Sequence, residues 1–177
     1  MNIAIVGNKH IAHDCSARID VADMVVRISK MDHLDSGLVG TRTDALYLEP
    51  NCVWWGYPPE RRRLDMLNTI PSIYIRNSWW RRTGEKLISQ GILRWDQVHV
   101  IPPEVENGLK DCTTFAMAVY DVHRRLPEAV ILGAGVDFGQ ERDRVFPYHA
   151  HSGGKFLYGQ PCQARSAFPY LISTTNK

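Results

Sequence analysis

The sequence has few cysteines, no long hydrophobic run and little net charge. Its 177 residues include four widely spaced cysteines without a C-x-x-C pair, Cys15, Cys52, Cys112 and Cys162, too few for the disulfide framework of a small secreted protein. No stretch reaches the ~18 apolar residues of a membrane-spanning helix, and the first residues lack the pattern of a signal peptide. We therefore expect a cytoplasmic protein with reduced thiols and no integral membrane segment.

The formal net charge is only +2, which provides no strong field to attract a nucleic acid. A small anionic ligand needs only a local patch and remains compatible with this charge. Hydrophobic residues make up 44% and charged residues 23% of the chain, as in ordinary globular proteins, and this composition excludes a coiled coil or a disordered chain. The length predicts one domain over residues 1–177.

Strand-like and helix-like segments alternate along the chain. Short apolar runs of strand character cover residues 3–6, 24–28, 45–48, 72–75, 98–101 and 129–132. Helical character is found at residues 14–19, 60–67, 79–90 and 112–126. Alternation of this kind produces parallel βαβ units. We predict an α/β fold with a single Rossmann-like, mainly parallel sheet sandwiched by helices, and no pattern from about residue 137 onward.

Ligands of open parallel sheets bind beyond the carboxyl ends of the strands, so the loops at these ends contain the candidate site. Gly7 and Asn8 follow the first strand, where glycine permits close backbone approach and the amide can donate and accept hydrogen bonds. Thr113 and Thr114 begin a helix, where free amides and the dipole favour a phosphate. The alternatives are a simple turn asparagine and a threonine that only caps the helix.

A glycine turn, Gly133-Ala134-Gly135, is expected after the strand at 129–132. With Gly139 it suggests a dinucleotide-binding loop, but the third glycine is one residue late and no amphipathic helix follows. The pattern therefore argues against a dinucleotide-dependent enzyme.

Two histidines, His149 and His151, stand beside a flexible glycine pair in the polar C-terminal third. Histidine can act as a base near neutral pH, or as a cation facing phosphate. The alternatives are surface histidines without a role and a zinc site, for which no third ligand has recognisable spacing. Because no D-x-D pair occurs either, we predict no metal site.

Tryptophan occurs in two adjacent pairs, Trp54-Trp55 and Trp79-Trp80. One member of each pair is expected in the core, and the other at a sugar-binding or partner surface. Such surfaces would suit self-association, so a homo-oligomer is left open.

Residues 5–46 resemble the L motif of the animal-type sialyltransferases. In that family a VGN turn is followed by IDxxDxVxRxN and by VGTKT. This chain has Val6-Gly7-Asn8, then Ile19, Asp20, Asp23, Val25 and Arg27 at the family spacing, and finally Val39-Gly40-Thr41-Arg42-Thr43.

Two later segments resemble further motifs of the same family. Residues 111–137 are similar to the S motif, with Thr113 and Thr114 at the positions of the Ser and Thr that hold the nucleotide, and a glycine turn at Gly133. Residues 148–156 look like motifs III and VS run together, with His149 and His151 at their histidine positions.

The resemblance implies a GT-A-like variant fold and a glycosyltransferase that uses a CMP-sugar such as CMP-sialic acid. It implies metal-independent inverting transfer, without a cofactor, to a hydroxyl of a glycan or glycolipid. His151 would act as the base and His149 as a cation facing the leaving phosphate. Asn8 and Ser29 would hold the nucleotide at the strand ends.

The chain departs from the family at specific positions. Ser29 replaces an Asn, Phe115 a Gly and Phe156 the VS glutamate, and the cysteine pair that bridges L and S is missing. The missing pair fits a reducing cytoplasm. The other departures support an alternative, a catalytically inactive nucleotide-binding or scaffold module of the same fold.

Overall fold

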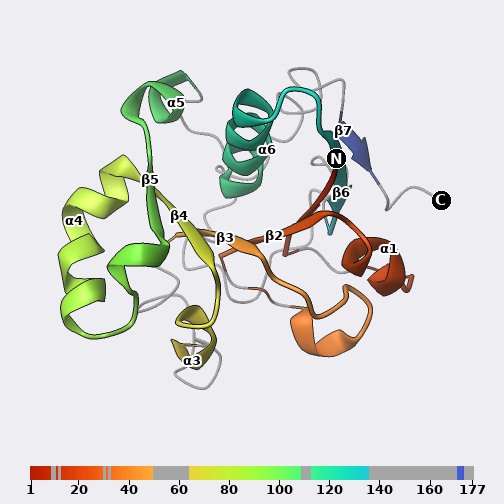
Figure 1. Ribbon diagram of the computed structural model, residues 1–177, viewed down its shortest axis with the longest axis horizontal. Helices are drawn as coiled ribbons and strands as arrows, with labels where there is room; N and C mark the ends of the chain where they lie inside the picture. The colour runs from red at the N-terminus through yellow and green to blue at the C-terminus, as the bar shows by residue number, and fades with distance from the viewer. Residues whose placement is uncertain are drawn as a thin grey trace, which may run out of the picture.

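Seven strands of the described residues pair in parallel and form one sheet (Figure 1). The computed structural model describes residues 1–8, 11, 13–29, 31, 33–49, 64–108, 113–135 and 171–173. The strands are β1 (Asn2–Val6), β2 (Met24–Ile28), β3 (Ala45–Leu48), β4 (Ser72–Arg76), β5 (Val98–Ile101), β6 (Val130–Ala134) and β7 (Leu171–Ser173). Their order across the sheet is β5-β4-β3-β2-β1-β6-β7. The predicted α/β fold with a mainly parallel sheet is confirmed.

Helices lie on both faces of this sheet (Figure 1). Those of the described residues are α1 (Ser16–Asp20), α3 (Leu64–Leu67), α4 (Asn77–Ser89), α5 (Pro103–Gly108) and α6 (Thr114–Arg125), with short 3-10 turns η1 (Leu34–Ser36) and η3 (Trp95–Gln97). α5 and α6 lie on one side of the sheet, α1 and α3 lie on the other, and α4 packs beside β4 and β5. The sheet is therefore sandwiched, as predicted.

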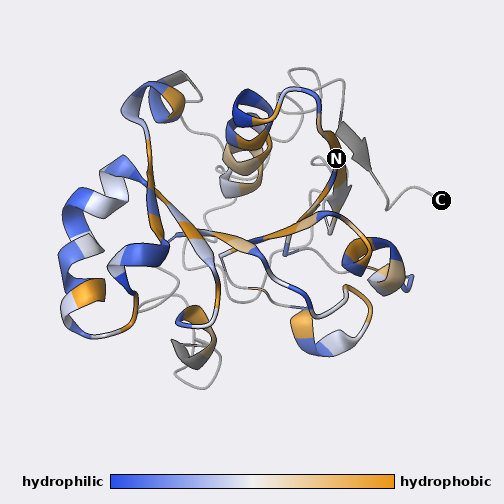
Figure 2. Cartoon of the chain, viewed as in Figure 1, coloured by the Kyte–Doolittle hydropathy of each residue, from blue (hydrophilic) through white to orange (hydrophobic). Residues whose placement is uncertain are grey.

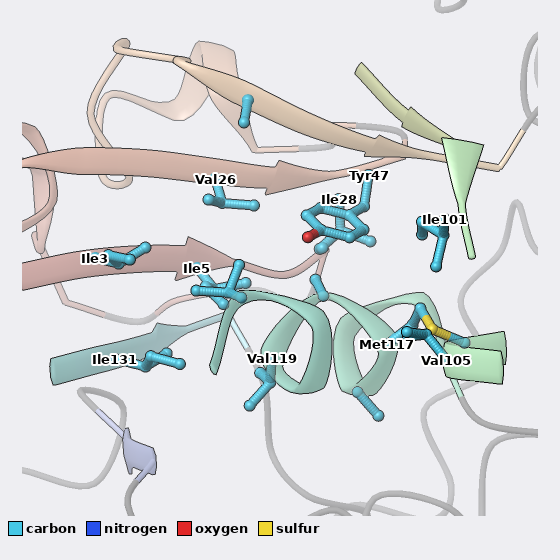
Figure 3. Close-up of a cluster of buried hydrophobic side chains, with 14 residues drawn as sticks. Ile3, Ile5, Val26, Ile28, Tyr47, Ile101, Val105, Met117, Val119 and Ile131 are labelled. Carbon is cyan, nitrogen blue, oxygen red and sulfur yellow. The ribbon is translucent and has the colours of Figure 1, made fainter. Parts of the chain in front are cut away.

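The face of the sheet beneath α6 carries an apolar cluster (Figure 3). Ile3 and Ile5 of β1 and Val26 of β2 are fully buried there, together with Met117 and Val119 of α6. Burial of each such side chain contributes about 1.5–3 kcal/mol. The hydropathy colouring of Figure 2 shows the strands largely orange through the centre, whereas α4 is mainly blue and pale.

The opposite face holds two further apolar clusters. Leu46 of β3 and Ile73 of β4 pack with Leu87 of α4, while Val25 of β2 packs with Ile19 of α1. Strands buried on both faces carry apolar residues continuously rather than in alternation, which is why the sequence showed them as short apolar runs.

Arg27 holds the loop that leads into β3. Its side chain is only 1% exposed and donates hydrogen bonds to the carbonyl oxygens of Val39, Gly40 and Arg42 and to the hydroxyl of Thr43, all at 2.9–3.0 Å. The planar guanidinium provides this fork of donors, which an ammonium group could not reproduce.

Asp20 secures the same loop from α1. Its carboxylate accepts hydrogen bonds from the backbone amides of Thr41 and Arg42, both at 3.2 Å. Gly40 lies against this carboxylate with φ +65°, and a Cβ there would be 2.2 Å from the Asp20 Oδ1 atom. The loop precedes β3, so Arg27, Asp20 and Gly40, which belong to the segment that resembles the L motif, stabilise the amino-terminal edge of the sheet.

Three local predictions differ from the structure. α5 begins at Pro103, where only a strand end was expected, because proline is well tolerated in a first helical turn, where its missing N–H costs nothing. β7 was not predicted, since its three residues are too few to show a period.

The expected turn at Gly133 is wrong: Gly133 pairs with Ile5 inside β6, and the strand continues to Ala134. Of the predicted helix at 60–67, residues 60–63 lie outside the described part.

Candidate functional site

The strand order makes the ends of β1 and β6 the point at which the connections of the sheet diverge. From β1 the chain proceeds through β2 to β5 on one side, and it returns on the other side with β6. Connections that diverge in this way open a crevice at the carboxyl ends of the two central strands, the usual ligand position in such folds. Gly7 stands there, and its amide donates a 2.8 Å hydrogen bond to the carbonyl of Ala134.

Asn8 and Gly135 flank this crevice. Asn8 is half-buried directly after Gly7, and Gly135 follows β6 with φ +64°, a conformation that glycine adopts without steric cost. Two strand ends therefore meet where the backbone can approach a ligand closely.

Ser29 ends β2 in an unusual conformation. Its φ is +39°, and Met31 follows with φ +51°, a region that residues other than glycine seldom occupy and that is enriched at functional sites. The Ser29 amide donates to the Tyr47 carbonyl at 2.8 Å, and its hydroxyl accepts from the Glu49 amide at 3.2 Å. The 8% exposed side chain thus joins the ends of β2 and β3.

Thr113 and Thr114 start α6 at the same edge of the sheet. Thr113 is the N-cap, and its hydroxyl accepts a 3.2 Å hydrogen bond from the amide of Ala116. The Thr114 hydroxyl lies 3.4 Å from a carboxylate oxygen of Glu49, which follows β3. The amides of the first helical turn have no intrahelical acceptors, so those of Thr114 and Phe115 can donate hydrogen bonds to a bound ligand.

Five of the predicted site residues therefore lie along one edge of the sheet: Gly7, Asn8, Ser29, Thr113 and Thr114. The N-cap alternative, which the sequence left open for one of the two threonines, applies to Thr113, whereas the Thr114 hydroxyl faces the end of β3.

Gly133 differs from these five residues. It is paired within β6 rather than placed in a turn, and Gly135 occupies the turn position instead. The catalytic candidates His149 and His151 lie outside the described residues, as do Trp54 and Trp55. Trp79 and Trp80 are both half-buried against the cluster of β3 and β4.

Glu49 is a further candidate site residue, which the sequence patterns did not indicate. It directly follows the predicted strand at 45–48, at the same edge as Gly7 and Ser29. An acidic residue immediately after a buried parallel strand was the available signal, because the polar end of such a strand faces the ligand crevice.

The described part of the chain lacks a metal-binding cluster and a membrane-spanning helix. No group of three or more His, Cys, Asp or Glu side chains is placed to hold a metal ion there. Among the same residues, no helix has the length and apolar character needed to cross a bilayer.

Comparison with solved structures identifies the fold. Two crystal structures of a mammalian sialyltransferase, one in complex with Gal-beta-1-3GalNAc-ortho-nitrophenol, match with a TM-score of 0.65 each. The sequence identities are 11% and 13%, and the alignments cover 99% of this chain and 70% and 69% of the neighbours. No protein-family model and no curated protein matches the sequence. The chain therefore has a sialyltransferase-like fold.

Proposed function

We propose that this chain is a glycosyltransferase that takes a CMP-activated sugar and transfers the sugar to an acceptor hydroxyl. The supporting observation is the shared edge of the sheet, where Gly7 and Asn8 follow β1 and the first turn of α6 lies beside the end of β3 at Thr114, within a sialyltransferase-like fold. Glycine, amide and helix-terminal groups are the means by which proteins hold a phosphate and a nucleoside.

The chemistry requires stabilisation of a leaving group and removal of one proton. As the glycosidic bond breaks, negative charge grows on the phosphate of CMP beyond the ends of β1 and β6, where the Asn8 side-chain amide can donate a hydrogen bond to it. His149 adds a positive charge near the phosphate, and His151 accepts the proton of the acceptor hydroxyl. Both histidine roles come from the motif resemblance. The proposed transfer needs neither a metal ion nor a cofactor, and the proposed location is the cytoplasm.

A second candidate function is nucleotide binding without transfer. The observation that favours it is the position of Ser29, whose side chain is buried and hydrogen-bonded between β2 and β3, where the family has a nucleotide-binding Asn. Phe115 and Phe156, in place of the family's Gly and Glu, point the same way. The two candidates share the donor site and differ only in turnover.

Calorimetric titration with CMP tests the donor site directly. We expect CMP to bind in metal-free buffer and NAD not to bind, with UMP as a second control. Asn8→Ala and Thr114→Val should each weaken CMP by about tenfold, the value of one or two hydrogen bonds. Asn68→Ala and Thr83→Val are matched controls, since Asn68 precedes β4 at the opposite edge and Thr83 lies within α4.

The outcomes separate the candidates. Absence of CMP binding by folded protein overturns both functions. CMP binding with transfer from CMP-sialic acid to Gal-beta-1-3GalNAc-ortho-nitrophenol, the compound bound in one structural neighbour, supports the enzyme. CMP binding with neither transfer nor donor hydrolysis supports the inactive module.

A further inference from the structure

Glu49 is a half-buried carboxylate at the β3 end of the proposed donor site. Its amide donates to the Ser29 hydroxyl at 3.2 Å, and its Oε2 atom lies 3.4 Å from the Thr114 hydroxyl. The side chain is thereby placed between the end of β2 and the start of α6. Within the described part of the chain no cation pairs with this carboxylate, so its charge is not neutralised by the fold there.

An ionised carboxylate only accepts hydrogen bonds. Among the described residues, the Thr114 hydroxyl lies near its Oε2 atom and no side chain donates to its Oε1 atom, which can therefore accept a hydrogen bond from a ligand. A phosphate beside it would be repelled, because two like charges in close contact oppose each other even near a protein surface. Glu49 and the phosphate therefore belong to different ends of the bound nucleotide.

The strand positions agree with this separation. Glu49 follows β3, and β2 lies between β3 and β1. Neighbouring strands are about 4.8 Å apart, so the end of β3 is roughly 10 Å from Gly7 and the β1–β6 crevice. A nucleoside monophosphate is long enough to place its phosphate at the crevice and its sugar or base at Glu49.

We infer that Glu49 determines donor specificity by accepting hydrogen bonds from the nucleoside. This inference rests on the proposed function. The groups of CMP that can donate are the ribose hydroxyls and the amino group of the base. UMP lacks that amino group, and its carbonyl oxygen would face the carboxylate unfavourably. A carboxylate at the end of a parallel strand holds ribose hydroxyls in Rossmann folds.

The test compares wild type and Glu49→Gln by calorimetry with CMP, 2′-deoxy-CMP and UMP. Gln preserves shape and one acceptor but removes the charge, and a charge-assisted hydrogen bond is about twice as strong as a neutral one. We expect Glu49→Gln to weaken CMP by about tenfold and to reduce the discrimination against one of the two analogues. Loss of the CMP preference over 2′-deoxy-CMP identifies the ribose, and loss of the preference over UMP identifies the amino group.

Glu85→Gln on the exposed surface of α4 is the matched control and should bind all three nucleotides as wild type does. Glu49→Asp retains the charge on a shorter side chain and should keep the preference between nucleotides better than Gln. Thermal unfolding of each variant shows whether the fold is intact.

Two results would overturn this role. CMP binding that is unchanged or tighter in folded Glu49→Gln means that Glu49 is structural or faces the phosphate, while the proposed function stands. A wild-type chain that binds none of the three nucleotides removes the proposed function, and the role of Glu49 with it.

Discussion

The hydroxyl of Tyr47 donates a 2.6 Å hydrogen bond to the carboxylate of Asp121 and so joins β3 to α6. Both side chains are buried, at 0% and 2% exposure. Arg125 donates to the same carboxylate at 3.1 Å and to the Tyr47 hydroxyl at 2.8 Å. These contacts fix the carboxyl-terminal half of α6 on the sheet, while its first turn lies at the proposed donor site. A polar anchor within an apolar interface permits one position of the helix along the strands.

Removal of this anchor is expected to destabilise the protein. Tyr47→Phe deletes the hydroxyl and leaves a buried carboxylate with one partner fewer, at a cost of about 1–3 kcal/mol in the free energy of unfolding. Tyr74→Phe removes a hydroxyl that accepts from Arg125 at 3.0 Å in a more exposed position, so it should cost less than about 1 kcal/mol. Urea denaturation of both variants measures the difference. Equal losses of unfolding free energy in the two variants would show that the buried Tyr47–Asp121 hydrogen bond contributes no more to stability than the exposed Arg125–Tyr74 one.

The same tyrosine should make stability depend on alkaline pH. Burial, and next the negative charge of Asp121, raise the pKa of Tyr47 above its ordinary value. The folded state therefore keeps this proton above pH ~10, where the unfolded chain loses it. The contribution of Tyr47 to stability is therefore fully present below that pH. Above it, the free energy of unfolding falls by up to about 1.4 kcal/mol per pH unit. Urea denaturation between pH 8 and 11 should show a steeper fall for wild type than for Tyr47→Phe. Parallel curves would contradict this prediction.

Gly40 should be far less tolerant of substitution than Gly37. Both have positive φ, but a Cβ at Gly37 meets nothing within 4 Å, whereas one at Gly40 would overlap the Asp20 carboxylate. Gly37→Ala should cost only the backbone strain of about 1–2 kcal/mol. Gly40→Ala should cost more, because Asp20 must also move from the amides of Thr41 and Arg42. Chemical denaturation of the two variants isolates the Asp20 contact, and an equal loss would argue against it.

Two substitutions of Thr113, one of which keeps the hydroxyl, test the N-cap of α6. Thr113→Ala removes the acceptor for the amide of Ala116 and should cost about 1 kcal/mol, whereas Thr113→Ser keeps the oxygen and should cost little. Thermal or urea unfolding distinguishes them. If the serine variant is as unstable as the alanine variant, the methyl group rather than the cap is responsible.

The predicted base can be tested by activity. His151→Ala should abolish sugar transfer and leave CMP affinity within a few-fold of wild type, because a general base acts on the acceptor rather than the nucleotide. His99→Ala is a suitable control, since His99 is exposed on β5 and stacks on Tyr74. Transfer assays and calorimetry provide the two readouts. Unchanged turnover in His151→Ala would refute the assignment of the base.

Local sequence patterns were sufficient for most of the described elements. Helix α6 was predicted because Val119 and Val122 recur on its buried side, and the period of a helix is a property of neighbouring residues. The parallel sheet followed from the alternation of apolar runs and helical segments. Gly7, Asn8 and Thr114 could be proposed as site residues because they stand where such elements begin or end.

Contacts between distant residues were decided only by the tertiary structure. Tyr47 and Asp121 are separated by 74 residues, and Thr114 and Glu49 by 65. No local period or spacing in the sequence therefore predicts that these side chains come into contact. The end of β6 was also misplaced, since Gly133 belongs to the strand through pairing with Ile5 and not through its own propensity. Hydrogen bonds across a sheet depend on which strands become neighbours, and that order is a property of the whole packed chain.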